Sequence, residues 1–140
     1  VAIAGSLVVF FLHPGFTRIK HFEIVFDAFG LGLFSANGAV IAAASGQSTL
    51  TSILVGAITA IGGGVIRDVL VNTVPGVLTR ELYAVSALLG AGSAVAILAL
   101  TGDDTLASLV GGALAVTLRL TSYARGWHLP KARLSGDPTA

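Results

Sequence analysis

The sequence predicts an all-α polytopic membrane protein, and three observations lead to this prediction. Of the 140 residues, 54% are hydrophobic and only 11% are charged, whereas soluble proteins carry about 25% charged residues. Four apolar stretches have the length needed to cross a hydrocarbon core of about 30 Å, which takes about 20 helical residues. The chain also contains 18 glycines, and small residues let the backbones of membrane helices approach closely.

The four stretches predict four transmembrane helices that form one membrane domain over residues 24–121. They run from about Ile24 to Ser45, from Thr49 to Val71, from Leu82 to Leu100 and from Thr105 to Thr121. Glycine, proline and short polar residues separate them, as expected of tight connections. Gly38, Ala42 and Gly46 in the first span and Gly56 and Ala60 in the second keep a four-residue step. We interpret these small residues as helix–helix contacts.

The two ends of the chain are interpreted separately. Residues 1–12 are apolar but too short to span a membrane, so we expect them to be the remnant of a transmembrane helix. The sequence contains no methionine, not even at position 1, which favours a chain that lacks its natural start. Residues 124–140 are polar, and we expect them to form a partly disordered cytoplasmic tail.

The basic residues predict the orientation in the membrane. With four spans, the lysines and arginines outside them all fall on one side: Arg18, Lys20, Arg80, Arg125, Lys131 and Arg133. The two connections on the other side contain no lysine or arginine, and one of them carries Asp103 and Asp104. Because basic residues favour the cytoplasmic side, we expect a cytoplasmic C-terminus.

Four charged residues lie inside the predicted spans at a similar depth. They are Asp27, Arg67, Asp68 and Arg119. Unpaired charge in a membrane is costly, so two acids and two bases at one level indicate mutual pairing. The cluster is either a structural set of ion pairs that locks helix ends or a charged gate at the cytoplasmic mouth of a permeation route. We hypothesise that both hold, with Arg67 paired to Asp27 or Asp68.

Three consecutive glycines, Gly62, Gly63 and Gly64, interrupt the second span within AITAIGGGVIRD. Each glycine weakens a helix by about 1 kcal/mol relative to alanine. Tight helix crossing would require one glycine per turn, so the run favours a kink or local unwinding. An unwound turn would offer carbonyl oxygens to a cation, or amides to an anion or carboxylate. The residues leave both options open.

Other function classes find no support in the sequence. The net charge of +1 gives no electrostatic footprint for nucleic acid. The chain has no cysteine, and its three histidines lie in loops or the tail without metal-ligand spacing, so no metal site is expected. The glycine run matches no nucleotide-binding motif, and no nucleophile–base arrangement is present. We therefore predict that the protein is not an enzyme and needs no cofactor.

The motifs together resemble the bacterial members of the trimeric intracellular cation channel (TRIC) family over residues 26–130. The matching segments are DAFGLGLF at 27–34, TAIGGGVIRDVL at 59–70, Pro75, ELYAVSALLGA at 81–91, LRL at 118–120 and WHLP at 127–130. The resemblance implies two inverted three-helix repeats plus a final helix, in a homotrimer with one pore per protomer. The four predicted spans would be the fourth to seventh helices, so the N-terminal part is missing, including the first repeat's glycine–Arg–Asp element.

The function that the resemblance implies is a monovalent cation channel of the bacterial inner membrane. Potassium would permeate a pore lined by glycine-kinked helices, with Gly62, Gly63 and Gly64 forming the kink beside Arg67 and Asp68. The alternative is a secondary transporter of a small zwitterion such as glycine, because related bacterial proteins are described in that way. Broken helices that face each other across inverted repeats suit a carrier as well as a channel. A membrane scaffold without permeation is the third interpretation.

Overall fold

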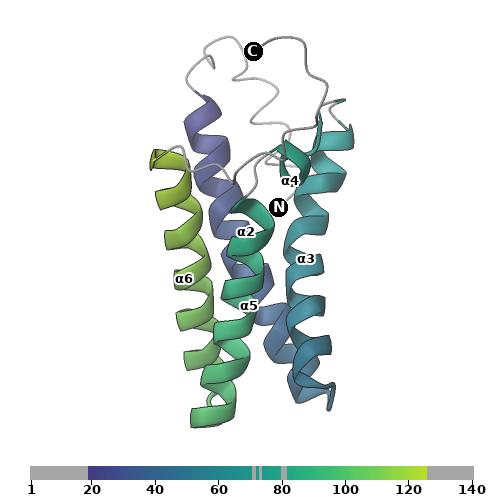
Figure 1. The fold of residues 1–140 in the computed structure, drawn as a ribbon, viewed down its shortest axis with the longest axis vertical. Helices are drawn as coiled ribbons and strands as arrows, with labels where there is room; N and C mark the ends of the chain where they lie inside the picture. The colour runs from purple at the N-terminus through teal and green to yellow at the C-terminus, as the bar shows by residue number, and fades with distance from the viewer. Residues whose placement is uncertain (1–18, 71, 73, 80–81, 126–140) are drawn as a thin grey trace, which may run out of the picture.

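The computed structural model describes residues 19–70, 72, 74–79 and 82–125. In this part of the chain, four long helices lie side by side: α2 (Ile19–Ala44), α3 (Thr49–Leu70), α5 (Leu82–Thr101) and α6 (Asp104–Arg125) (Figure 1). A short helix, α4 (Gly76–Thr79), lies at the end of the bundle where α3 ends and α5 begins. All four long helices are long and apolar enough to cross a membrane, which confirms the predicted fold class.

The structure differs from the sequence prediction mainly at helix ends. α2 begins at Ile19 and α6 continues to Arg125, past the predicted start and end of these spans. Helix α4 was not predicted, because Pro75 and Gly76 indicated only a break. Proline fits the start of a helix, where no amide is required, and the Pro75 carbonyl accepts a hydrogen bond from the Leu78 amide at 2.9 Å. The predicted helix remnant at 1–12 and residues 126–140 of the predicted tail lie outside the described residues.

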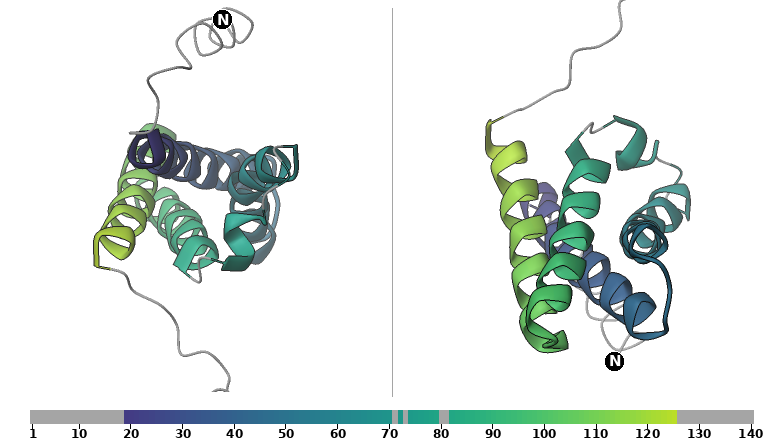
Figure 2. Two further views of the ribbon diagram at one scale, coloured as in Figure 1. Left: turned by 90° about the horizontal axis from the view of Figure 1, so that it is seen from above. Right: turned by 60° about the horizontal axis from the view of Figure 1, so that its bottom comes forward.

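The helices are arranged so that α3 is the least enclosed. Seen from above, α5 lies between α6 and α3, and α2 runs along all three (Figure 2). Among the described residues, α3 contacts α2, α4 and α5 but not α6. Only 22% of the apolar, membrane-spanning segment of α3 is buried inside the structure, against 44% of the corresponding segment of α2. One side of α3 is therefore uncovered by the described part of the chain.

Small residues fill the interior of the bundle, and large apolar residues face outward. The alanines that are fully buried are Ala28, Ala36, Ala39, Ala87, Ala91, Ala94, Ala107 and Ala115. The largest fully buried side chains are only Leu31, Ser35 and Ser52. Phe26 and Ile58, by contrast, are 73% and 68% exposed. This distribution is expected in lipid, which solvates large apolar side chains as well as a protein interior does.

Glycines allow close backbone contacts between helices, as the surroundings of Gly56 and Gly111 show. A Cβ atom added at Gly56 would lie 2.3 Å from the Ser35 carbonyl oxygen, so α2 and α3 touch backbone to backbone. A Cβ added at Gly111 would lie 2.7 Å from the Gly90 carbonyl oxygen, which joins α6 to α5 in the same way. Gly38 lies in a helix–helix contact as predicted, and its partner in the structure is Gly56: an added Cβ at Gly38 would lie 3.1 Å from the Gly56 Cα. Gly46 instead lies in the turn after α2, with a φ of 80°.

Asp103 caps the N-terminus of α6 and gives a first testable prediction. Its Oδ1 accepts hydrogen bonds from the amides of Thr105 at 2.9 Å and Leu106 at 3.0 Å. Replacing Asp103 with alanine is expected to lower the free energy of unfolding by about 1 kcal/mol, because these amides lose their acceptor. Thermal unfolding in detergent measures the change. Asp104→Ala is the control, and an equal loss in both variants would contradict the capping role.

Candidate functional site

Five polar side chains from four helices meet at the end of the bundle where α3 ends and α5 begins. They are Asp27 on α2, Arg67 and Asp68 on α3, Tyr83 on α5 and Arg119 on α6. We call this group the charged cluster. Four of its members were predicted from the sequence, and Tyr83 is an addition from the structure.

Arg67 lies at the centre of the charged cluster. Its Nε and Nη2 donate to Asp68 Oδ1 at 3.1 and 2.8 Å. Its Nη1 lies 3.4 Å from Asp27 Oδ1 on the neighbouring helix α2. The two pairings that the sequence offered as alternatives are therefore present together. A guanidinium with several donors in one plane is suited to hold two carboxylates at once.

Asp68 connects the end of α3 to α4. While its Oδ1 accepts from Arg67, its Oδ2 accepts a hydrogen bond from the Gly76 amide at 2.8 Å. Gly76 is the first residue of α4, where backbone amides have no acceptor within the helix. Asp68 is only 8% exposed, so a buried carboxylate holds the chain reversal between α3 and α5 in place.

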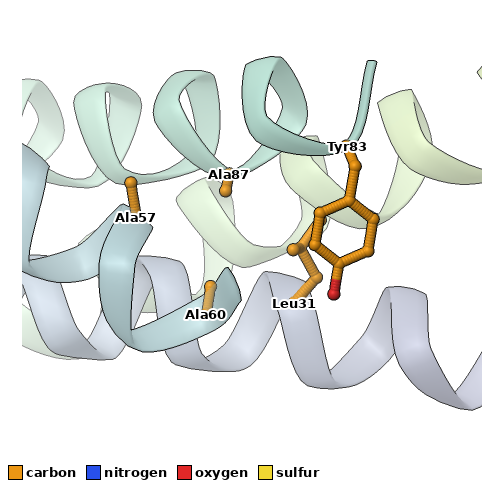
Figure 3. Close-up of a cluster of buried hydrophobic side chains, with 5 residues drawn as sticks. All are labelled: Leu31, Ala57, Ala60, Tyr83 and Ala87. Carbon is orange, nitrogen blue, oxygen red and sulfur yellow. The ribbon is translucent and has the colours of Figure 1, made fainter. Parts of the chain in front are cut away.

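Tyr83 links the acidic part of the cluster to Arg119. Its hydroxyl donates to Asp27 Oδ1 at 3.3 Å, and its ring lies under the Arg119 guanidinium, whose Cζ is 4.7 Å from the ring centre. This distance is within the range of a cation–π interaction. Tyr83 and Arg119 are 4% and 2% exposed. In Figure 3 the ring of Tyr83 reaches from α5 past Leu31 of α2.

The three glycines of α3 have different surroundings. A Cβ added at Gly62 or Gly63 would meet nothing within 4 Å in the described residues, whereas one at Gly64 would lie 2.6 Å from the Tyr83 hydroxyl oxygen. Helix α3 continues without interruption from Thr49 to Leu70. The expected unwound turn is therefore absent, because glycine lowers helix stability without removing any backbone hydrogen bond. The kink stays a prediction.

Gly63 and Arg67 lie one turn apart on the uncovered side of α3. The side chain of Arg67 is 42% exposed, and Gly63 is also exposed. Thr59, one turn before Gly63, is exposed too, and its hydroxyl donates to the Val55 carbonyl at 2.7 Å. A charged group on a membrane helix is costly in contact with lipid and is found facing protein or water. This side of α3 thus has the character of a protein-facing or water-facing surface.

Sequence reasoning missed Tyr83 and the Asp68–Gly76 contact. A signal for Tyr83 was present, because a tyrosine in an apolar helix requires a partner for its hydroxyl. Asp27 and Arg119, which contact Tyr83 in the structure, were both predicted to lie near the cytoplasmic ends of their helices. No comparable signal identified Gly76, since its amide becomes a donor to Asp68 only when α4 forms.

Comparison with known proteins gives both a family and a fold. Residues 24–99 match the model of a family described as glycine transporter. A UPF0126 membrane protein of Deinococcus radiodurans is 36% identical over 135 residues, which cover 95% of this chain and 62% of the relative. The UPF0126 inner membrane protein YadS of Escherichia coli K12 is 36% identical over 131 residues, 92% of this chain and 62% of the relative. The chain thus spans about three fifths of the length of these relatives.

Two solved structures share the fold. A TRIC cation channel superposes with a TM-score of 0.85 at 35% identity, and the alignment covers 97% of this chain and 67% of the channel's chain. A TRIC trimeric intracellular cation channel orthologue from Rhodobacter sphaeroides superposes with a TM-score of 0.77 at 36% identity. That alignment covers 86% of this chain and 62% of the orthologue. The arrangement of α2 to α6 is therefore the arrangement found in TRIC channels.

Proposed function

We propose that this chain, which belongs to the glycine transporter family and has the fold of the TRIC cation channels, is part of a monovalent cation channel. Potassium is the proposed permeating ion. The functional unit is a homotrimer in the bacterial inner membrane, as the trimeric orthologue suggests, with the C-terminus in the cytoplasm. The uncovered side of α3 forms one wall of the pore.

The observation that carries this proposal is the exposure of Arg67 beside Gly63. Arg67 is 42% exposed on the side chain, although it stands in the last turn of a membrane-spanning helix. One turn earlier, Gly63 leaves the backbone of α3 uncovered by any described residue. A charge and a bare backbone on one helix face are tolerated in a membrane where they line a water-filled cavity. This combination favours a permeation route along α3.

The surroundings of Arg67 are compatible with cation passage. A lone arginine in a pore would repel a cation, but this guanidinium contacts Asp27 and Asp68 together. The two carboxylates offset its charge, and with Arg119 the charged cluster holds two acids and two bases. Such a cluster presents no net positive barrier at the proposed mouth.

The alternative function is secondary transport of a small zwitterion such as glycine. The family description favours it, and so does the chemistry of the cluster. The exposed part of the Arg67 guanidinium suits a substrate carboxylate, and the adjacent carboxylates suit an ammonium group. A carrier would require the cluster to open during each transport cycle, whereas a channel would conduct without a saturable binding step.

Single-channel recording of the full-length protein in planar bilayers tests the proposal. Under potassium and sodium gradients, we expect discrete cation-selective openings that disappear in Gly63→Leu, because the new side chain enters the route. Ile58→Trp is the matched control, since Ile58 is 68% exposed and lies about 140° around α3 from Gly63. This variant should conduct like the unmodified protein.

Each other result identifies a different function. A silent bilayer together with saturable uptake of labelled glycine into liposomes would replace the channel with the transporter. If neither current nor uptake is observed, the interpretation as a membrane scaffold without permeation would replace the channel proposal. Equal current in Gly63→Leu and the unmodified protein would remove the glycine face of α3 from the route.

A further inference from the structure

We propose that Tyr83 is a positioning residue for the charged cluster, and that Gly64 is a glycine so that the Tyr83 hydroxyl can reach Asp27. This inference deepens the proposed function, because the cluster is the proposed mouth of the route. It assigns the third glycine of the run to a side-chain contact between α3, α5 and α2. On this assignment, the predicted kink would depend on Gly62 and Gly63 and not on Gly64.

The first argument is the space at Gly64. A Cβ added there would lie 2.6 Å from the Tyr83 hydroxyl oxygen, 3.5 Å from its Cζ and 3.6 Å from Asp27 Oδ1. Only the contact with the hydroxyl oxygen is prohibitively short, while the other two are ordinary van der Waals contacts. The same test at Gly62 and Gly63 meets nothing within 4 Å among the described residues. The space beside Gly64 is therefore occupied by one particular atom of Tyr83.

The second argument is that Tyr83 has little freedom to move away. It is 4% exposed and belongs to a buried cluster with Leu31, Ala57, Ala60 and Ala87 (Figure 3). Arg119 covers the ring, with its Cζ 4.7 Å from the ring centre. A rigid ring in a close-packed site cannot rotate to accommodate a methyl group without shifting these neighbours.

The third argument is that Tyr83 and Arg67 share one acceptor. Tyr83 Oη and Arg67 Nη1 lie 3.3 and 3.4 Å from the same oxygen, Asp27 Oδ1. Both distances are longer than the usual range for their bond types. Asp27 is thus held between α5 and α3, and the position of the hydroxyl decides how far the carboxylate leans toward Arg67. Tyr83 acts on Arg67 through Asp27.

A double-mutant cycle in the full-length protein tests the assignment without relying on any transport activity. Thermal unfolding in detergent is measured for Gly64→Ala, Tyr83→Phe and the double variant. We expect Gly64→Ala to lower Tm by about 3 to 8 °C, since it displaces the hydroxyl from a charged acceptor. Tyr83→Phe keeps the ring under Arg119 and removes the clashing atom, so the double variant should melt no lower than Tyr83→Phe alone.

Two matched controls accompany the cycle. Gly63→Ala places the same methyl group on the neighbouring residue and should leave Tm unchanged or raise it, because alanine favours helix. Tyr123→Phe removes the same hydroxyl from the other tyrosine, which is 40% exposed on α6, and should not relieve Gly64→Ala. Losses in Tm that simply add in the double variant would overturn the proposal. If Gly64→Ala fails to fold, recovery of folded protein in the double variant is the expected result.

Single-channel recording separates a positioning role from a purely structural one. We expect Gly64→Ala to change the open probability of each channel by at least several-fold, and Tyr83→Phe to restore it in the double variant. A purely structural role would reduce the number of active channels at constant open probability, and this result would overturn the positioning role. If the unmodified protein carries no current, the channel proposal fails, while the unfolding cycle still decides the Gly64–Tyr83 contact.

Discussion

Replacing Asp68 with alanine is expected to lower the free energy of unfolding by about 2 to 4 kcal/mol. The substitution removes the hydrogen bonds that Asp68 accepts from the Arg67 guanidinium and from the Gly76 amide. A hydrogen bond to a charged group contributes about 1.5 to 3 kcal/mol. Water reaches the half-exposed Arg67 and recovers part of the loss. Unfolding of the full-length protein in detergent, followed by circular dichroism, gives the value.

Asp68→Asn separates the two roles of the carboxylate. The amide oxygen of asparagine can still accept from Gly76, but the side chain no longer carries a charge for Arg67. We expect Asp68→Asn to lower the free energy of unfolding by about half as much as Asp68→Ala does. A loss below about 1 kcal/mol in Asp68→Ala would contradict the conclusion that this residue fixes the reversal between α3 and α5.

Replacing Gly56 with alanine is expected to lower the free energy of unfolding by about 3 kcal/mol, at the upper end of the usual range for overpacking. An added Cβ would lie 2.3 Å from the Ser35 carbonyl oxygen and 2.9 Å from the Ala39 amide nitrogen. Both atoms belong to the backbone of α2, which has no rotamer to change. The two helices would have to separate, and the contacts along their length would weaken.

Gly63→Ala is the control for Gly56→Ala, because it makes the same change in the same helix. No described residue lies within 4 Å of the position of its Cβ, so alanine should be neutral or stabilising by up to about 1 kcal/mol. Equal destabilisation in the two variants would show that helix propensity rather than helix contact governs glycine in α3.

The spans and the small-residue contacts could be predicted from the sequence because each depends on a local pattern. An apolar stretch of about 20 residues has few alternatives to a membrane helix, and the four-residue spacing of small residues around Gly38 and Gly56 indicated that they lie in helix–helix contacts. The pairing of Arg67 was predicted for a related reason. The four intramembrane charges that were predicted at one depth, Asp27, Arg67, Asp68 and Arg119, have few partners other than one another.

The remaining features depend on contacts between distant parts of the chain. The Tyr83–Asp27 contact requires α5 to lie beside α2 and requires space at Gly64, and no local pattern encodes either condition. The Gly76 amide is available to Asp68 only because the chain turns into α4 after Pro75. The sequence predicted a kink or local unwinding at the glycine run. No unwound turn forms there, because packing against α2 and α5 holds α3 helical through a segment of low intrinsic propensity, and the kink stays a prediction.

The choice of small residues for the interior has a thermodynamic consequence. Alanine and glycine have no side-chain rotamers, so bringing these helices together restricts almost no side-chain motion. Many of the leucines, isoleucines and phenylalanines, which have rotamers to lose, point outward, as Phe26 and Ile58 do, although Leu31 and Ile24 are buried. Helix association in this bundle therefore costs less side-chain entropy than it would with a core of large side chains. Its stability depends on how closely the backbones approach, and this makes it sensitive to the addition of a single methyl group at Gly56 or Gly111.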